Sequence, residues 1–407
     1  MKKNYLTIIL LLALQFTFAQ IVNIPDANFK NALLTHNCAD FDGDTFPDGD
    51  ADTNNDGEID VTEANAVLGL NLDSDFIDSL EGIASFTNIQ FITCINNNLT
   101  QLDVSQNINL VNLQCNSNDI IELDLSTNIN LTILNANFNE LTTLTLGNNS
   151  NLDWVRCASN NLTTIDFSQL SNLRRLSIGY NQLTSIDVSN NLLLEELLTF
   201  NNQITFFDLS LNANLITLLT ASNALNYLDT SNNPLLERLD CTFNNLAFLD
   251  VSTNTNLVDL YCQNNLLTGL DVKNGTNTNI NTFNASNNPN LTCINVDDAA
   301  YSQSQSSWTK DATASYDTNC PALSTDEFNK AIAISMYPNP TTGKLQIESK
   351  QALSQVIVYN LVGQQVKAFT MQIDQNSIDI SALKTGSYFV NVQSTTGNTY
   401  TKLIVKK

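Results

Sequence analysis

The stretch Leu113-Gln114-Cys115-Asn116-Ser117-Asn118 recurs 21 residues later as Leu134-Asn135-Ala136-Asn137-Phe138-Asn139. This six-residue pattern begins ten times between Ile92 and Phe283, and its sixth position is asparagine every time. Nine of the starts are evenly spaced, the tenth follows a short insertion near Lys273, and a variant coil begins at Leu70. Such repetition predicts a solenoid, because one coil cannot bury its apolar face alone and must stack on its neighbours.

The first and third positions of the pattern are apolar or small, which predicts a short strand with those side chains inward and the intervening one outward. Five cysteines take the third position, where other coils carry Ala136, Ile178 or Thr199: Cys94, Cys115, Cys157, Cys241 and Cys262. We therefore interpret them as core thiols. The alternative is a metal or disulfide ladder between coils, although no Cys-x-x-Cys spacing or nearby histidine supports zinc.

The asparagine at the sixth position is expected to turn the chain out of the strand and to bond backbone groups of the adjacent coil. A second motif follows, as in Leu102-Asp103-Val104-Ser105, and predicts an extended segment on the opposite wall. Its aspartates recur at one position, which favours turn or capping bonds over a unique site: Asp103, Asp124, Asp166, Asp187, Asp208, Asp229, Asp250 and Asp271.

Together these motifs resemble the leucine-rich-repeat family in its short-coil bacterial variety, from about Leu68 to Asn295. The resemblance implies a repeat solenoid of about 11 coils, with short parallel strands on the concave face, over residues 69–292.

The formal net charge of −24 argues against nucleic acid and anionic membranes as partners, and suits divalent cations or cationic partners. The single histidine, His36, is remote from any catalytic motif and is expected at the surface. Residues 1–19 have a positive start, an apolar run too short to span a membrane and a small-residue cleavage site, so they predict a signal peptide. We expect an exported protein without a transmembrane segment.

Residues 20–68 are expected to form an N-terminal cap. Within them, the stretch from Asp52 to Glu63 matches the EF-hand loop and predicts a structural Ca²⁺ site. The predicted ligands are Asp52, Asn54, Asp56, Glu58, Asp60 and Glu63. The preceding Asp40, Asp42, Asp44, Asp48 and Asp50 add carboxylates that would repel one another without a cation. The alternative is a solvated acidic loop.

Residues 293–320 are expected to cap the last coil, with Cys293 paired to Cys320 and Cys38 left without a partner. A polar linker, residues 321–333, precedes a segment of alternating strands at 344–349, 355–359, 387–392 and 400–405. This segment contains three motifs: Tyr-Pro-Asn-Pro-x-x-Gly from Tyr337, Val-Tyr-Asn-Leu-Val-Gly-Gln from Val358 and Leu-Lys-Thr-Gly-Ser-Tyr from Leu383. Together they resemble the type-A C-terminal sorting domain of the type IX secretion system. The resemblance implies that residues 334–407 form an all-β, sandwich-like domain that engages outer-membrane secretion and attachment machinery and is often removed.

Strand alternation also predicts which side chains line the concave face. Three of the four arginines fall there, and no lysine occurs from Leu68 to Val272. The candidate ligand-binding residues are Trp154, Arg156, Arg175, Glu196, Leu198, Phe200, Leu219, Arg238, Asp240 and Tyr261. Exposed aromatic residues mixed with arginine are typical of binding hot spots. The alternative is that the aromatic rings bury against neighbours while arginine pairs with Glu196 and Asp240.

The sequence therefore favours a secreted or surface-attached binding or adhesion protein that recognises an extracellular protein or glycan. A passive surface-coat or spacer protein is the second hypothesis, because the early coils are uniformly rich in Asn and Thr. A carboxylate-dependent hydrolase is the third and least favoured, because no nucleophile motif, phosphate-binding loop or dinucleotide fingerprint occurs.

Overall fold

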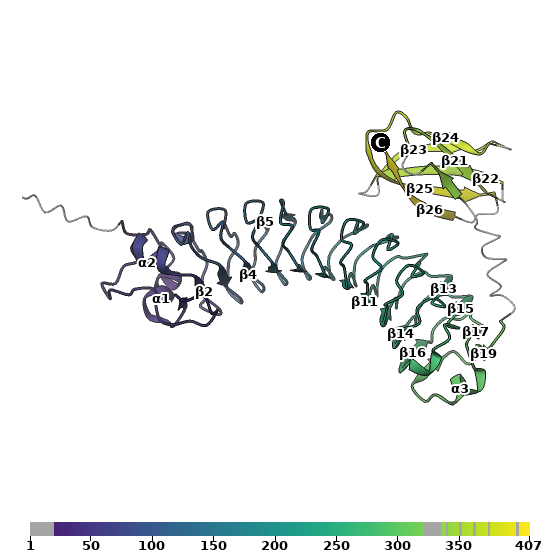
Figure 1. Ribbon diagram of the computed structural model, residues 1–407, viewed down its shortest axis with the longest axis horizontal. Helices are drawn as coiled ribbons and strands as arrows, with labels where there is room; N and C mark the ends of the chain where they lie inside the picture. The colour runs from purple at the N-terminus through teal and green to yellow at the C-terminus, as the bar shows by residue number, and fades with distance from the viewer. Residues whose placement is uncertain are drawn as a thin grey trace, which may run out of the picture.

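The computed structural model describes residues 20–320, 335–338, 341–349, 352–360, 364–372, 375–395 and 399–407. The predicted signal peptide and linker lie outside these residues, as do positions 339–340 and 361–363 of the sorting-domain motifs. Residues 20–320 form an arc of stacked coils (Figure 1).

The N-terminal cap contains helix α1 (Ala27–Thr35), helix α2 (Val61–Ala66) and strand β1 (Ala39–Asp40). Asp26 caps α1 by accepting the N–H groups of Asn28 and Phe29, and α1 buries Phe29, Ala32 and Leu33. Strand β1 pairs antiparallel with β2 (Gly69–Asn71), the first strand of the solenoid. The cap thus closes the end of the main sheet.

The main sheet has 13 strands, and beyond β2 they pair parallel and in register. Most are three residues long, with the central side chain buried and the flanking two directed outward. The sheet follows the inner side of the arc (Figure 1), as the sequence predicts. Its further strands are β3 (Phe91–Thr93), β4 (Asn112–Gln114), β6 (Ile133–Asn135), β8 (Trp154–Arg156), β9 (Arg175–Ser177), β10 (Glu196–Leu198), β11 (Thr217–Leu219), β12 (Arg238–Asp240), β14 (Asp259–Tyr261), β16 (Thr282–Ala285) and β18 (Trp308–Lys310).

The opposite wall is only partly stranded. Strands β5 (Glu122–Asp124) and β7 (Thr143–Thr145) pair with each other, and a second sheet contains β13 (Phe248–Asp250), β15 (Gly269–Asp271), β17 (Cys293–Asn295) and β19 (Ser315–Asp317). Short 3₁₀ helices occupy Ile83–Ser85 and Asn277–Asn279. The predicted extended segments of the second motif therefore become strands in some coils only.

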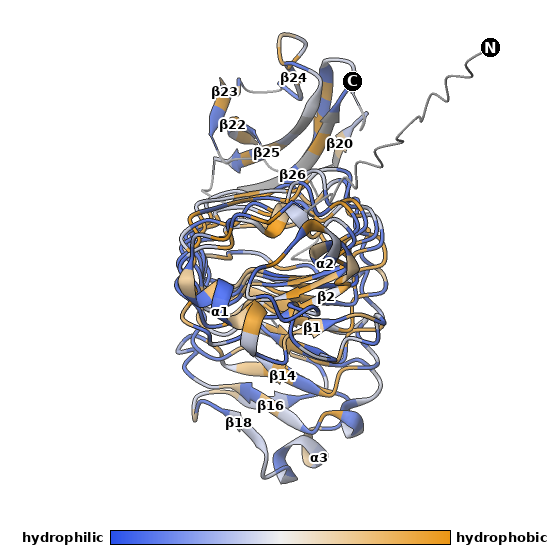
Figure 2. Ribbon diagram, turned by 90° about the vertical axis from the view of Figure 1, so that its left-hand side faces the viewer, coloured by the Kyte–Doolittle hydropathy of each residue, from blue (hydrophilic) through white to orange (hydrophobic). Residues whose placement is uncertain are grey.

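The asparagine at the sixth position bonds as predicted. The Asn118 amide group donates to the carbonyls of Cys94 and Cys115, and its oxygen accepts the Leu99 N–H at 3.0 Å. A second buried asparagine column, not recognised in the sequence, stands on the opposite wall: Asn107, Asn128, Asn149, Asn191, Asn212, Asn233 and Asn254. Asn128, for example, donates to the carbonyls of Val104 and Asn107 in the preceding coil. Figure 2 shows hydrophobic and hydrophilic residues alternating around the coils that these columns join.

The C-terminal cap differs from the expectation, because it continues the solenoid. Strand β18 extends the main sheet, so twelve coils contribute strands where about 11 were predicted. Trp308 is buried against Phe283 and donates to the carbonyl of Ile280. Helix α3 (Ala299–Ser304) lies between β17 and β18. Sequence spacing missed the last coil because its strand begins with tryptophan and has no asparagine column.

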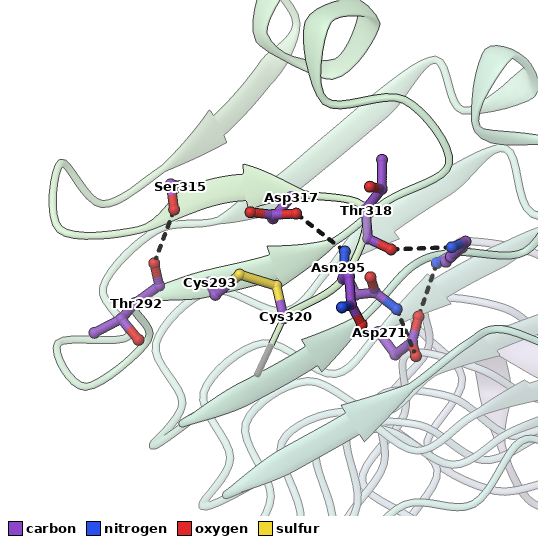
Figure 3. Close-up of a disulfide and its surroundings, with 10 residues drawn as sticks. Asp271, Thr292, Cys293, Asn295, Ser315, Asp317, Thr318 and Cys320 are labelled. Carbon is purple, nitrogen blue, oxygen red and sulfur yellow. Dashed lines mark hydrogen bonds between the residues drawn. A yellow bond between two sulfur atoms is a disulfide. The ribbon is translucent and has the colours of Figure 1, made fainter. Parts of the chain in front are cut away.

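Cys293 and Cys320 form a disulfide with their Cα atoms 5.8 Å apart, which is the pairing expected from the sequence (Figure 3). Around it, Asn295 donates to the Asp271 carboxylate, and Lys273 donates to the Thr318 carbonyl. Burial raises the pKa of Asp271. Cys38 is a free, buried thiol that donates to the carbonyl of Ala32.

The C-terminal domain consists of two antiparallel sheets. One has the order β20 (Ser335–Tyr337), β21 (Lys344–Glu348), β24 (Ser377–Asp379), and the other β23 (Gln365–Thr370), β22 (Leu353–Asn360), β25 (Gly386–Ser394), β26 (Thr399–Lys406). They share a core that includes Leu345, Val356, Val390 and Ile404. All four predicted strands are present. The sequence missed β20, β23 and β24, which are either short or largely exposed.

Candidate binding face

The structure places nine of the ten predicted ligand-binding residues on strands of the concave sheet, and the tenth, Phe200, lies just beyond the end of β10. Two rows run across strands β8 to β14. The register aligns Trp154, Arg175, Glu196, Thr217, Arg238 and Asp259 in one row, and Arg156, Ser177, Leu198, Leu219, Asp240 and Tyr261 in the other. With parallel strands about 4.8 Å apart, the two rows extend roughly 25 Å along the solenoid.

Trp154 contacts two cationic side chains. The guanidinium carbon of Arg156 lies 3.3 Å from the centre of the Trp154 ring, and that of Arg175 lies 4.5 Å from it. Burial lowers the pKa of Arg156, and the charge of Glu196 opposes this shift. Cation–π contacts of this kind hold the indole and both guanidinium groups in place without an external ligand.

Arg175 and Arg238 pair with carboxylates other than Glu196 and Asp240, the partners expected in the alternative interpretation of the sequence. Arg175 approaches Asp153 at 3.5 Å, and Arg238 approaches Asp259 at 3.5 Å. Pairing with Glu196 and Asp240 is therefore wrong as a description of these contacts; the Asp240 carboxylate instead accepts the Thr242 N–H. Both ion pairs are long and well exposed, so each contributes little to stability.

An apolar stretch lies beside this cationic cluster. Leu198 and Leu219 are half-buried neighbours on adjacent strands. The ring of Phe200 lies against Gly179, where a Cβ atom would come within 2.6 Å of it. Phe200 also meets Tyr180 edge-to-face, with ring centres 5.4 Å apart. Strand alternation does not predict the position of Tyr180, because Tyr180 lies in the turn that follows the strand.

The predicted Ca²⁺ loop is closed by hydrogen bonds to its first acidic residue, Asp52. The Asp52 carboxylate accepts the N–H groups of Asp56 and Gly57, and Gly57 has φ +82°, a conformation that favours glycine. Asp60 caps α2 and forms a capping box with Glu63. Asp52 and Glu63 are both buried, so the first and last predicted ligands face inward.

A neighbouring acidic group is more tightly converged. Ligand oxygens of Asp40, Asp42 and Asp48 all lie within 4.8 Å of one another, and within the described part of the chain they form the one such group of three or more. The additional aspartates noted in the sequence therefore form a group of three converging carboxylates, whereas the predicted ligands from Asp52 to Glu63 form no such group.

The repeated aspartates of the second motif act as expected. Each accepts the backbone N–H two residues further on, at Ser105, Ser126, Ser168, Ser189, Ser210, Ser231, Ser252 and Lys273. Two of them, Asp103 and Asp124, line a cavity of about 630 Å³ together with Glu81 and Glu122. Hydrogen bonds from Ser105 and Ser126 lower the pKa of Asp103 and Asp124 respectively. A glycosidase acid needs a raised pKa, so neither residue suits that role.

The five cysteines of the solenoid are free and fully buried. Burial raises the pKa of Cys115 and Cys157 to about 12 and shifts the other three in the same direction. Thiols in such surroundings are poor nucleophiles and poor metal ligands. His36 is half-exposed and lies 3.1 Å from the Asp75 carboxylate. None of the helices described is long and apolar enough to cross a bilayer.

The solenoid has the leucine-rich-repeat fold. It resembles the functional domain of InlJ from Listeria monocytogenes, whose structure includes a cysteine ladder, at 20% identity and a TM-score of 0.50, covering 96% of this chain and 99% of that one. A leucine-rich-repeat protein of Leptospira interrogans matches at 18% identity and a TM-score of 0.44, and the match covers 63% of this chain and 85% of that one. Internalin InlF of L. monocytogenes matches at 19% identity and a TM-score of 0.41, and the match covers 75% of this chain and 99% of that one. No curated protein sequence matches the chain.

Residues 335–406 match the secretion system C-terminal sorting domain. This domain directs secretion across the outer membrane, followed by surface attachment or release. The chain is therefore a secreted bacterial leucine-rich-repeat protein.

Proposed function

We propose that this protein binds an extracellular protein or glycan through its concave face, either attached to the cell surface or released. The observation that carries the proposal is the cluster of Trp154, Arg156 and Arg175 on the concave sheet. A chain with net charge −24 and four arginines places three of them on this face. Clustered arginine and aromatic side chains are enriched at sites that dominate binding energy.

The cluster favours a ligand that carries carboxylates or other anionic groups. Arg175 holds Asp153 only at 3.5 Å, so a ligand carboxylate can compete for its guanidinium group. Leu198, Leu219 and Phe200 would cover the apolar part of the same ligand. A passive coat or spacer protein needs neither feature, since a uniform polar surface would serve.

The test is capture from arrays of extracellular proteins and glycans. The native protein is compared with a Trp154→Ala/Arg175→Ala/Arg238→Ala variant. Arg174→Ala is the control for loss of a positive charge, because Arg174 precedes β9 outside the two rows, where it pairs with Glu195 and shares Asp153 with Arg175. Binding by the native and control proteins, reduced at least about tenfold in the triple variant, supports the proposal. Equal capture by all three, or no capture, favours the coat or spacer.

We also propose that the N-terminal cap binds Ca²⁺ and that the ion has a structural role. The buried carboxylates of Asp52 and Glu63, the turn at Gly57 and the converging Asp40, Asp42 and Asp48 support it. Calorimetric titration with CaCl₂ tests it, with Glu63→Gln as the variant and the exposed Glu81→Gln as the control. Binding lost in the former and kept in the latter is expected. Absence of heat in the native protein, after prior removal of metal, would contradict it.

A further inference from the structure

A row of exposed aromatic side chains runs beside the concave sheet, separate from the cluster around Trp154. Phe138, Tyr180 and Phe243 each occupy the fifth position of the repeat, immediately after a strand. They are 60%, 56% and 58% exposed, respectively. We call these three residues the aromatic ridge. Large apolar side chains that remain exposed in a repeated position point to an interaction surface.

The backbone makes this placement unfavourable for the fold. The fifth position is left-handed, with φ of +54°, +53° and +52° at the three ridge residues. Other coils fill it with serine or asparagine, as at Ser117, Asn201 and Asn264, and asparagine tolerates this conformation much better than a bulky residue. Since the rings are exposed and their backbone is strained, packing does not account for them, and strain of this kind is concentrated at functional sites.

The ridge residues are aligned along the solenoid, two and three coils apart. The interstrand ladder continues through the turn, because Phe138 N–H donates to the Ala158 carbonyl and Tyr180 N–H to the Phe200 carbonyl, both at 2.9 Å. At about 4.8 Å per coil, Phe138 and Tyr180 are roughly 10 Å apart, and Tyr180 and Phe243 roughly 14 Å. Phe200, held over Gly179 and against Tyr180, widens the central platform.

Uncharged and acidic hydrogen-bonding groups accompany the rings. Two positions beyond the ridge, Asn161 donates to Glu140 at 2.6 Å, and Gln182 donates to Asn161 at 3.4 Å. No lysine or arginine occupies the fifth to seventh positions of any coil from Ile92 to Asn265. Rings separated by amide and hydroxyl side chains do not form the continuous apolar groove that a hydrophobic peptide requires. The missing cations disfavour sulfated or uronic-acid chains.

We propose that the aromatic ridge binds a neutral linear polysaccharide, whose sugar rings place their C–H faces on Phe138, Tyr180 with Phe200, and Phe243. Its hydroxyl groups would bond the row of Glu140, Asn161 and Gln182. Aromatic side chains suit this role because they combine a flat apolar face with little conformational freedom to lose. This site shares Phe200 with the proposed concave site but uses none of its arginines, and it goes beyond the proposed function.

The test is affinity electrophoresis of the secreted protein in native gels that contain one neutral polysaccharide each: mixed-linkage β-glucan, xylan, galactomannan or pullulan. Polygalacturonate is the charged comparison. The variant is Phe138→Asn/Tyr180→Asn/Phe243→Asn, which introduces the residue that other coils carry at this position and therefore keeps the fold. Far-UV circular dichroism checks that it does. Trp154→Ala/Arg175→Ala is the second variant, directed at the cationic cluster.

Retardation by at least one neutral polysaccharide is expected, with an apparent affinity at least about tenfold lower in the ridge variant and unchanged in the cluster variant. Three results would overturn the inference: no retardation by any neutral chain, retardation by polygalacturonate alone, or equal retardation of the native and ridge-variant proteins. Loss of binding only in the cluster variant would also overturn it, while supporting the proposed concave site.

Discussion

Replacing Asn181 by alanine tests whether the asparagine column holds the coils together. The Asn181 side chain is buried and joins two adjacent coils. Its oxygen accepts the Leu162 N–H at 3.0 Å, and its amide group donates to the carbonyls of Cys157 and Ile178 at 2.9 and 3.1 Å. Alanine removes these three bonds together with a longer one, from the amide group to the Gly179 carbonyl at 3.3 Å.

The cost is set by which groups remain paired. The Cys157 carbonyl keeps the Asn160 amide group, and the Ile178 carbonyl keeps that of Asn202. The Leu162 N–H is buried and has no second acceptor among the bonds the structure shows. The orphaned Leu162 donor costs about 1–3 kcal/mol and each of the two lost amide bonds to Cys157 and Ile178 about 0.5–1.5 kcal/mol, so we expect destabilisation by about 2–6 kcal/mol.

Equilibrium urea unfolding, followed by far-UV circular dichroism and tryptophan fluorescence, measures this difference. Asn190→Ala is the control, because Asn190 is exposed in the same coil and should change stability by less than about 0.5 kcal/mol. Because coils are coupled mainly to their neighbours, unfolding of the variant should begin in the central coils. If Asn181→Ala proves as stable as Asn190→Ala, the asparagine column does not contribute the expected stabilisation to the solenoid.

Three further changes follow from the structure. Chelation of calcium should lower the melting temperature of the native protein but not of Glu63→Gln, as differential scanning calorimetry would show; equal shifts would contradict the Ca²⁺ proposal. Removing the Cys293–Cys320 disulfide by double alanine substitution should cost about 3 kcal/mol in urea unfolding, since it closes a loop with a sequence separation of 27. Burial raises the pKa values of Cys115 and Cys157 from 9.0 to about 12, so these thiols contribute fully to folding stability below pH 9 and lose that contribution as the pH rises toward 12. The urea midpoint of unfolding should therefore fall over that pH range, and it should fall less in Cys115→Ala/Cys157→Ala.

Much of the fold was predictable because the same spacing of apolar residues and asparagine recurs in every coil of the repeat. Ten coils place asparagine at the sixth position, so its burial and bonding could be inferred without coordinates. The second column, which includes Asn107 and Asn191, also recurs in sequence, but it stands among other asparagines in a polar loop, where composition does not distinguish buried from exposed residues. The last coil, which contributes β18, was not predicted because the residues around Trp308 lack the repeat pattern.

The candidate site was predictable in position but not in contacts. Strand alternation placed Trp154, Arg175 and Arg238 on one face, and the register does align them. Ion-pair partners depend on side-chain rotamers, which periodicity does not encode, so Asp153 and Asp259 were not chosen over Glu196 and Asp240. The aromatic ridge was missed because a left-handed turn interrupts the alternation on which the prediction depended.

The central claim, that the concave face is the binding surface, is tested most directly by hydroxyl-radical footprinting of the native protein with a captured ligand. Mass spectrometry reports the oxidation of each side chain with and without that ligand. If the concave face is the binding surface, Trp154 and Tyr261 lose reactivity, while the exposed Leu192 and Leu211, which lie outside the concave rows, keep theirs. Protection of Leu192 and Leu211 with unchanged oxidation of Trp154 would contradict it.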